Sequence, residues 1–231
     1  MQGEKGYRQI DINLGCPFPM IAGKHKGAGM LLYPAQVAEV LAPIAEYPEI
    51  QFSLKMRLGW ENASECMVLV ELLNTLRLSR IALHARTGKQ QYKGHPDLEA
   101  FQGFYELCQH PLYYNGGIES LSDIRQILIR FPLLKGVFIG RGLLSSPLLA
   151  KEFKGNETFL PEQRMSIYFA FHEELFSAYS QVLQGETQLL VKMKTLWECF
   201  LPETDRKLLK RIKKSTRLQQ YTESVKAIFT S

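Results

Sequence analysis

Short hydrophobic segments alternate with helical ones, and this alternation constrains the fold of the 231-residue chain more than any other sequence feature. Because the order strand, helix, strand repeats four times, it predicts parallel strands joined by crossover helices. The expected strands are Ile10–Asn13, Phe52–Met56, Ile81–His84, Leu112–Asn115 and Val137–Gly140. The clearest helical patterns between them are Ala35–Glu46, Ser64–Leu76 and Ser120–Phe131.

Polar and glycine residues gather directly after each expected strand. In a TIM barrel the active site lies at this carboxyl end of the strands, whereas an open doubly wound sheet binds its ligand at a switch point. All five strand ends contribute such residues, which favours a barrel-like arrangement. The residues are Cys16, Arg57 and Gly59, Arg86 and Thr87, Gly116 and Gly117, and Arg141 and Gly142.

The pattern changes near residues 150–160. Lys154-Gly155-Asn156 is typical of a linker, and Pro161 begins a segment with helical periodicity only. We therefore predict an α/β, TIM-barrel-type domain over residues 1–154, followed by a small all-helical domain over 155–231. The expected helices of the second domain are a stripe from Tyr168 to Val182, Leu189–Phe200 and Asp205–Phe229.

Composition excludes several classes of protein. No run reaches the ~20 apolar residues of a membrane helix, and the polar start of the chain is unlike a signal peptide. The four cysteines are scattered without a C-x-x-C pair, which argues against a zinc site and against a disulfide framework. A reduced, cytoplasmic setting without a metal is the expectation, and the oligomeric state is not predicted.

Positive charge is concentrated near the end of the chain. The net charge is only +5, yet seven Lys or Arg and no acid lie between Arg206 and Arg217. On one continuous helix, Lys207, Lys210, Lys214 and Arg217 would share a face. This face is either a stripe for a nucleic-acid backbone or an ordinary solvent-exposed helix surface.

Three expected strand ends carry side chains suited to ligand chemistry. Cys16 lies in a loop opened by Gly15 and closed by Pro17, where a thiol can meet a ligand. Lys55 and Arg57 fall on one face of their strand and could hold an anionic or carbonyl-rich ligand, or could be two rim cations. His84, after an apolar strand, could be structural or could donate to a ligand carbonyl.

Glycine motifs follow the last two expected strands. Glycine lets the backbone approach a phosphate, and free N–H groups before a helix favour an anion. Arg141 would add a charge-assisted partner. Because TIM barrels commonly place a phosphate site at their last strand ends, the two motifs suggest a phosphorylated cofactor. The motifs are Asn115-Gly116-Gly117 and Gly140-Arg141-Gly142.

Together these segments resemble the tRNA-dihydrouridine synthase family across about Ile10–Ser146. The matching motifs are the Asp11–Leu32 segment, Lys55-x-Arg57-x-Gly59, His84-x-Arg86-Thr87 with Tyr92-x-Gly94, and the two glycine motifs. The resemblance implies an FMN enzyme, reduced by NADPH, that adds two hydrogens across the C5–C6 bond of a uridine in tRNA. It also implies that Cys16 protonates C5 while the flavin gives a hydride to C6.

The same resemblance assigns the other site residues. Lys55 and His84 would contact the flavin, as would Asn115, Gly116, Gly117, Gly140 and Arg141. Asn13 and Arg57 would lie near the uracil, and Arg86 would begin a loop near the RNA. Lys24 and Lys26 would meet RNA phosphates or remain solvated loop lysines. Lys210 and Lys214 would bind tRNA through the helical domain.

The chain also departs from the family pattern. A closed barrel needs eight strands, and only five are expected here, the first beginning at Ile10. The resemblance therefore predicts a barrel that lacks its N-terminal part, with weak FMN binding and little activity. A noncatalytic tRNA-binding fragment is one alternative. An FMN barrel enzyme for a small molecule, such as a dihydroorotate-oxidising type, is another, although the Cys16 loop and the basic stretch count against it.

Overall fold

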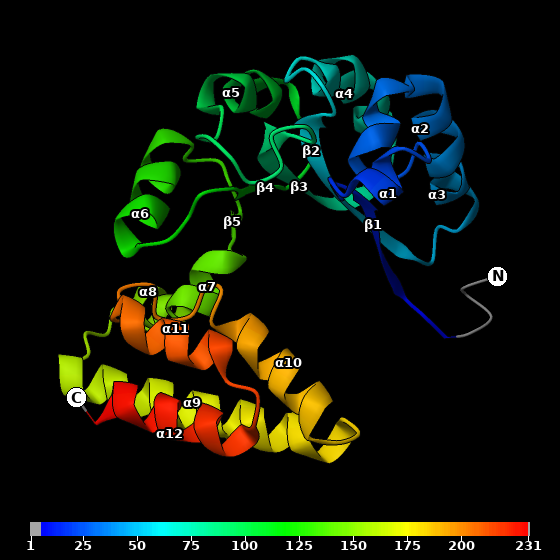
Figure 1. Cartoon of the computed structure of the whole chain (residues 1–231). Helices are drawn as coiled ribbons and strands as arrows, with labels where there is room; N and C mark the ends of the chain where they lie inside the picture. The colour runs from blue at the N-terminus through cyan, green and yellow to red at the C-terminus, as the bar shows by residue number, and fades with distance from the viewer. Residues whose placement is uncertain (1–5, 231) are drawn as a thin grey trace. The chain divides into compact units, whose positions relative to one another are not determined.

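The computed structural model describes residues 6–230 and divides into two compact units. The first, called the barrel unit, comprises the chain up to Ile118 together with Ser122–Ile139. The second, called the helical unit, comprises Glu119–Leu121 and the chain from Gly140 onward. Figure 1 shows the parallel strands of the first and the helices of the second.

A five-stranded parallel sheet forms the barrel unit. Its strands are β1 (Gln9–Leu14), β2 (Gln51–Gly59), β3 (Leu78–Thr87), β4 (Leu112–Asn115) and β5 (Gly136–Phe138). They lie side by side in sequence order, so that each strand pairs with the next one along the chain. This order has no switch point, and it is the strand order of a TIM barrel. The expected α/β, TIM-barrel-type architecture is confirmed for five strands.

Helices cover one face of this sheet (Figure 1). They are α1 (Pro19–Ala22), the 3-10 helix η2 (Gly27–Leu32), α2 (Pro34–Leu41), α3 (Pro43–Glu46), α4 (Glu65–Thr75), α5 (Leu98–Leu107) and α6 (Leu121–Arg130). The single helix expected over Ala35–Glu46 is two helices, because Pro43 has no N–H to continue the first. Helix α5 begins where the Asp97 side chain accepts a hydrogen bond from the Ala100 N–H.

The two faces of the sheet differ in chemistry because successive side chains of a strand alternate between them. Leu54, Met56 and Leu83 are fully buried on the face that packs against α4 and α5. Strand register aligns polar side chains across the other face, which we call the polar face. Its residues include Asp11, Asn13, Ser53, Lys55, Arg57, Arg80, His84 and Asn115. The predicted site residues of four strands thus share one surface.

The helical unit consists of α7 (Arg141–Ser145), α8 (Leu149–Gly155), α9 (Pro161–Val182), α10 (Glu186–Leu196), α11 (Arg206–Lys214) and α12 (Leu218–Phe229). The expected boundary after residue 154 lies inside this unit, which begins at Gly140. Helix α8 belongs here because its buried Glu152 pairs with Arg164 of α9. Ser146, which ends α7, also bonds Tyr168 of α9 at 2.7 Å.

The expected helix Asp205–Phe229 is also two helices. Asp205 caps α11 by accepting from the N–H groups of Lys207 and Leu208. The chain leaves the helix at Ser215, whose backbone oxygen accepts from the Lys194 ammonium of α10. Arg217 is therefore not on α11 and instead precedes α12, so the expected four-residue face is reduced to its first three lysines.

A hydrogen-bonded histidine lies in the core of the helical unit. The His172 Nε2 atom is 2.7 Å from the Tyr221 hydroxyl, and Nδ1 is 3.0 Å from a Glu173 carboxylate oxygen. The indole N–H of Trp197 donates to the same hydroxyl at 2.9 Å. Burial lowers the pKa of His172, and the bond to Glu173 opposes this with a smaller effect.

This histidine predicts that the helical unit loses stability in acid. Below about pH 6.5 this histidine binds a proton in the unfolded chain, whereas burial opposes its protonation in the folded chain. The free energy of unfolding therefore decreases as the pH is lowered, by at most about 1.4 kcal/mol per pH unit. Urea unfolding followed by Trp197 fluorescence in a Trp60→Phe background measures this slope. His172→Gln should flatten it, whereas exposed His25→Gln should leave it unchanged. An unaltered slope in His172→Gln would refute the assignment.

Candidate functional site

The Cys16 loop is held by short-range hydrogen bonds at the carboxyl end of β1. The Asn13 side-chain oxygen accepts from the Gly15 N–H at 2.9 Å, and the Cys16 carbonyl accepts from the Ala28 N–H at 2.9 Å. Gly27 has φ +56°, and a Cβ there would lie 2.8 Å from the Cys16 Cβ. Only glycine fits this approach, so η2 packs closely beneath the half-buried thiol.

Arg57 connects this loop to the loop that follows β3. Its side chain is 1% exposed. Nε donates to the Gly15 carbonyl at 3.0 Å, while Nη1 donates to the carbonyls of Thr87 at 2.8 Å and Gln91 at 2.7 Å. The guanidinium also lies 5.4 Å from the centre of the Tyr92 ring. These bonds go to backbone acceptors, so Arg57 positions two loops, and contact with a uracil stays a prediction.

Lys55 lies beside the Cys16 loop on the polar face. A Cβ placed on Gly15 would be 3.4 Å from the Lys55 ammonium nitrogen, which locates this charge next to the turn. Burial lowers the pKa of Lys55, and nearby Arg57 lowers it further, while Asp11 and Cys16 act in the opposite direction. The Asp11 carboxylate is itself bonded to the Ser53 hydroxyl. This crowding of cations favours an electron-rich or anionic ligand.

His84 and Arg86 form a second buried group at the end of β3. Arg86 Nη2 donates to the Gly94 carbonyl at 2.9 Å, and Nη1 lies 3.3 Å from His84 Nε2. Because a guanidinium only donates, Nε2 is the acceptor and the ring hydrogen is assigned to Nδ1. Arg86 therefore holds one edge of the His84 ring and orders the loop that was expected near RNA.

The two predicted glycine motifs fall in different units. In the barrel unit, Asn115 Nδ2 donates to the Phe138 carbonyl at 2.7 Å. Gly116 follows with φ +129°, where a Cβ would lie only 3.0 Å from the His84 ring. Gly140 and Arg141 are exposed and open α7 of the helical unit. A joint phosphate site for the two motifs stays a prediction.

The predicted RNA contacts lie on exposed surfaces of both units. Lys24 and Lys26 are exposed between α1 and η2. Lys210 and Lys214 line a shallow depression together with Lys207 and Arg211, which also belong to α11, and Gln220, which belongs to α12. The lysine-rich face therefore exists on a well-formed helix, with Asp205 as its cap.

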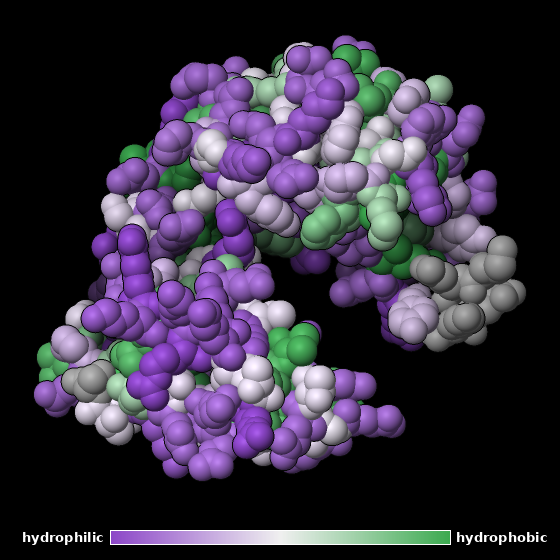
Figure 2. All heavy atoms as spheres, in the orientation of Figure 1, coloured by the Kyte–Doolittle hydropathy of each residue, from purple (hydrophilic) through white to green (hydrophobic). Residues whose placement is uncertain are grey.

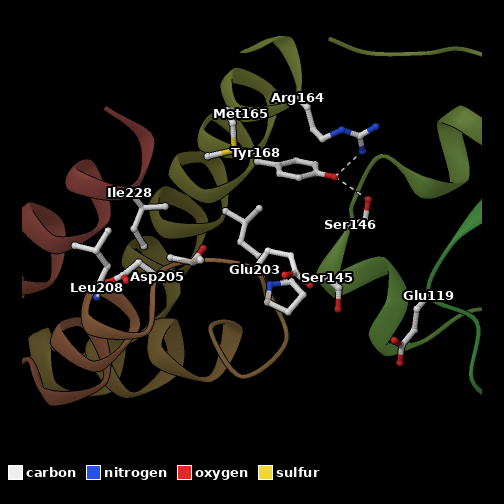
Figure 3. Close-up of a pocket in the computed structure, with 13 residues that line it drawn as sticks. Glu119, Ser145, Ser146, Arg164, Met165, Tyr168, Glu203, Asp205, Leu208 and Ile228 are labelled. Carbon is white, nitrogen blue, oxygen red and sulfur yellow. Dashed lines mark hydrogen bonds between the residues drawn. The ribbon is translucent and has the colours of Figure 1, made fainter. Parts of the chain in front are cut away.

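A larger cavity in the helical unit contains no residue predicted from sequence. It measures about 580 Å³ and is lined by side chains that include Glu119, Met165, Glu203 and Ile228. Figure 3 shows the Tyr168 hydroxyl on its wall, bonded to Ser146 at 2.7 Å and to Arg164 at 3.1 Å. The first bond joins the end of α7 to α9 and the second lies within α9, and both indicate a structural role for the cavity wall.

The donor set of the polar face fits a flavin phosphate or ring carbonyl. Lys55, Arg57 and Arg86 are cationic, and His84 lies beside Arg86, whereas Asp11 is the acid bonded within this group. Gly116 leaves the space beside His84 that a side chain would fill. Within residues 6–230, no cluster of His, Cys, Asp or Glu could hold a metal ion, and no helix is long and apolar enough to cross a membrane.

Comparison with known proteins decides the family. The family model for dihydrouridine synthase (Dus) matches residues 1–230. The chain belongs to the dihydrouridine synthase family. It is 28% identical to tRNA-dihydrouridine synthase B of Vibrio vulnificus over 163 residues, which are 69% of this chain and 50% of that relative. The resemblance predicted from the sequence motifs is thereby confirmed.

Further relatives give the same result. The chain is 28% identical to tRNA-dihydrouridine synthase B of Vibrio cholerae over 167 residues, or 71% of this chain and 52% of the relative. It is 29% identical to the Pseudomonas aeruginosa protein of the same name over 150 residues, or 64% and 45%. The chain spans about half the length of the curated relatives it matches.

In this dihydrouridine synthase family member, the structure gathers most of the predicted barrel residues at one end of the polar face. Sequence reasoning missed the acceptors that organise them, which are the backbone carbonyls of Gly15, Thr87, Gln91 and Gly94. A backbone carbonyl carries no residue signature. Only the recurrence of Arg two positions after Lys55 and after His84 could have suggested buried guanidinium groups.

Proposed function

We propose that this chain carries the active-site half of a tRNA-dihydrouridine synthase, which reduces the C5–C6 bond of a uridine in tRNA with FMN as cofactor and NADPH as reductant. The observation that carries the proposal is the hydrogen-bonded Cys16 loop beside the cations of the polar face. Family membership supports the reaction class. A cytoplasmic setting belongs to the same proposal.

The residues of the site have different roles in this reaction. FMN, when bound, supplies the hydride for C6 of the uracil ring. Cys16 donates its thiol proton to C5 and so acts as the general acid. Arg57 holds the Gly15 carbonyl and thereby fixes the direction of the Cys16 loop. Lys55 and His84 would hold the flavin ring, and the Gly116–Gly117 backbone would hold its phosphate.

The absorbance spectrum of the purified protein, with and without added FMN, tests this proposal directly. Bound flavin that NADPH bleaches, followed by dihydrouridine in tRNA, would support it. The second candidate function is a tRNA-binding fragment without catalysis, favoured by the lysine-rich face of α11. Saturable tRNA binding without any flavin binding would select this second candidate and would exclude the first.

Charge reversal on α11 tests the tRNA contact. Lys210→Glu with Lys214→Glu is expected to weaken tRNA binding by tenfold or more at low salt, because two phosphate partners become repulsive. The slope of log affinity against log salt should fall by about 1 for each lysine that meets a phosphate. Lys154→Glu with Lys192→Glu changes the charge of the same unit equally and is the control. If both variants had the same tRNA affinity and the same salt dependence, α11 would be an ordinary solvent-exposed helix without a role in tRNA binding.

A further inference from the structure

Large apolar side chains are exposed immediately after the candidate catalytic loop. Phe18 is 61% exposed, Met20 is 82% exposed and Ile21 is 39% exposed, although hydrophobic residues of this size are usually buried. We call these three residues the apolar tip. They begin two positions after Cys16 and belong to α1 and its N-cap. Figure 2 shows hydrophobic side chains at the surface in the region of α1.

The backbone holds the apolar tip outward. The Phe18 carbonyl accepts from the N–H groups of Ile21 and Ala22, each at 2.9 Å, which fixes the turn. The segment then returns to the Cys16 loop, where Ala28 donates to the Cys16 carbonyl and Gly27 packs against it. The exposed side chains are therefore presented by a well-bonded segment whose two ends both meet the Cys16 loop.

The charge around the apolar tip is complementary to a polyanion. Lys24, His25 and Lys26 follow it and are all exposed. His25 stacks on Tyr33 with ring centres 4.2 Å apart. No acidic residue occurs between Asp11 and Glu39. Apolar and aromatic side chains among basic ones, with no acid, are typical of surfaces that contact nucleic acid.

We propose that the apolar tip is a wedge that enters the RNA base stack next to the target uridine and fills the space left when that uridine turns toward Cys16. This inference rests on the proposed function. Phe18 is two residues from Cys16, and two residues span at most about 7 Å. Successive bases are about 3.4 Å apart, so the tip lies within about two base steps of the thiol that the uridine meets. Apolar wedges that replace a base in its stack offset the cost of extrusion. Lys24 and Lys26 would hold the adjoining phosphates.

The double variant Phe18→Ala with Met20→Ala tests the wedge. The first probe is a stem–loop RNA with one uridine stacked beside a 2-aminopurine, whose fluorescence rises on unstacking. The second is a short oligouridylate, in which no stable stack has to be opened. We expect the variant to lose the fluorescence rise and to bind the stem–loop about tenfold more weakly, with little change for the oligouridylate.

Two matched controls separate the tip from exposed apolar area in general. Val68 is 66% exposed and Ile129 is 80% exposed, and both lie on other helices of the barrel unit. Val68→Ala and Ile129→Ala should bind and unstack the stem–loop like the parent chain. An equal loss in the controls, or an equal loss with both RNA probes, would overturn the wedge.

The remaining outcomes distinguish the wedge from the function on which it rests. If the parent chain unstacks the stem–loop and the double variant does so equally well, the wedge is refuted while the proposed function survives. If the parent chain binds neither RNA, both are refuted. If the parent chain is a dimer that the double variant dissociates, the tip is a self-association surface and the wedge is again overturned.

Discussion

Replacing Cys16 with Ala is expected to lower the rate of dihydrouridine formation by about two to four orders of magnitude, the usual contribution of a general acid. The loop keeps its shape in this variant, because the bonds of Asn13 to Gly15 and of Ala28 to Cys16 involve no Sγ atom. The loss should therefore appear in the chemical step. Single-turnover conversion of uridine in tRNA, with prereduced flavin, measures that step.

Binding measurements give this prediction its control. Affinities for FMN and for tRNA should remain within about twofold of the parent values. A twofold change corresponds to about 0.4 kcal/mol of binding free energy. Cys108→Ala removes another half-buried thiol of the barrel unit, one that lies near the His110 carbonyl, and should leave turnover intact. Unchanged turnover in Cys16→Ala would remove the thiol from the mechanism and leave the loop without its proposed role.

Replacing Arg57 with Met is expected to lower the free energy of unfolding of the barrel unit by about 3 kcal/mol. Three backbone carbonyls, of Gly15, Thr87 and Gln91, would lose a charged donor in a buried site, and each unsatisfied buried group costs about 1–3 kcal/mol unless water reaches it. The loops after β1 and β3 should separate locally before the sheet unfolds. Amide hydrogen exchange would show faster exchange in both loops together.

A conservative variant and an exposed arginine complete this experiment. Arg57→Lys keeps the charge but cannot reproduce the fork of donors, so it should recover only part of the stability. Arg80→Met removes an exposed arginine that lies 5.7 Å from the Phe138 ring, and it should cost less than about 1 kcal/mol. Faster exchange confined to one loop would contradict the role of Arg57 as a link between the two.

The parallel sheet and its order were predictable because each strand is an apolar run that ends in glycine or polar residues. The observed strands contain or closely overlap the expected ones, with differences of one to three residues at most ends. Pairing followed from the repeated strand–helix unit, since parallel neighbours need crossover helices. The polar face followed less directly, because only the register, which places Arg57 beside His84, shows that the polar residues of β2 and β3 share one face.

The remaining features depend on contacts that a linear pattern does not contain. The compact helical unit begins at Gly140, before the predicted boundary, and Glu152 pairs with Arg164 across residues 155–160. Arg217 is not part of the basic stripe because helix α11 ends before Ser215, whose backbone oxygen accepts a hydrogen bond from Lys194 of another helix. Arg57 and Arg86 were assigned to substrate from the resemblance alone, whereas the structure shows what their guanidinium groups hold in place.

The strand order of the barrel unit has a consequence for biosynthesis. Every strand pairs with its immediate predecessor, so no strand waits for a distant one before it can be bonded. On a ribosome, β2 can join β1, and each later strand can then add to the exposed edge as it emerges. Among these five strands, folding in this direction makes each strand the template of the next one. The strand that leads into the Cys16 loop is therefore also the surface on which β2 assembles.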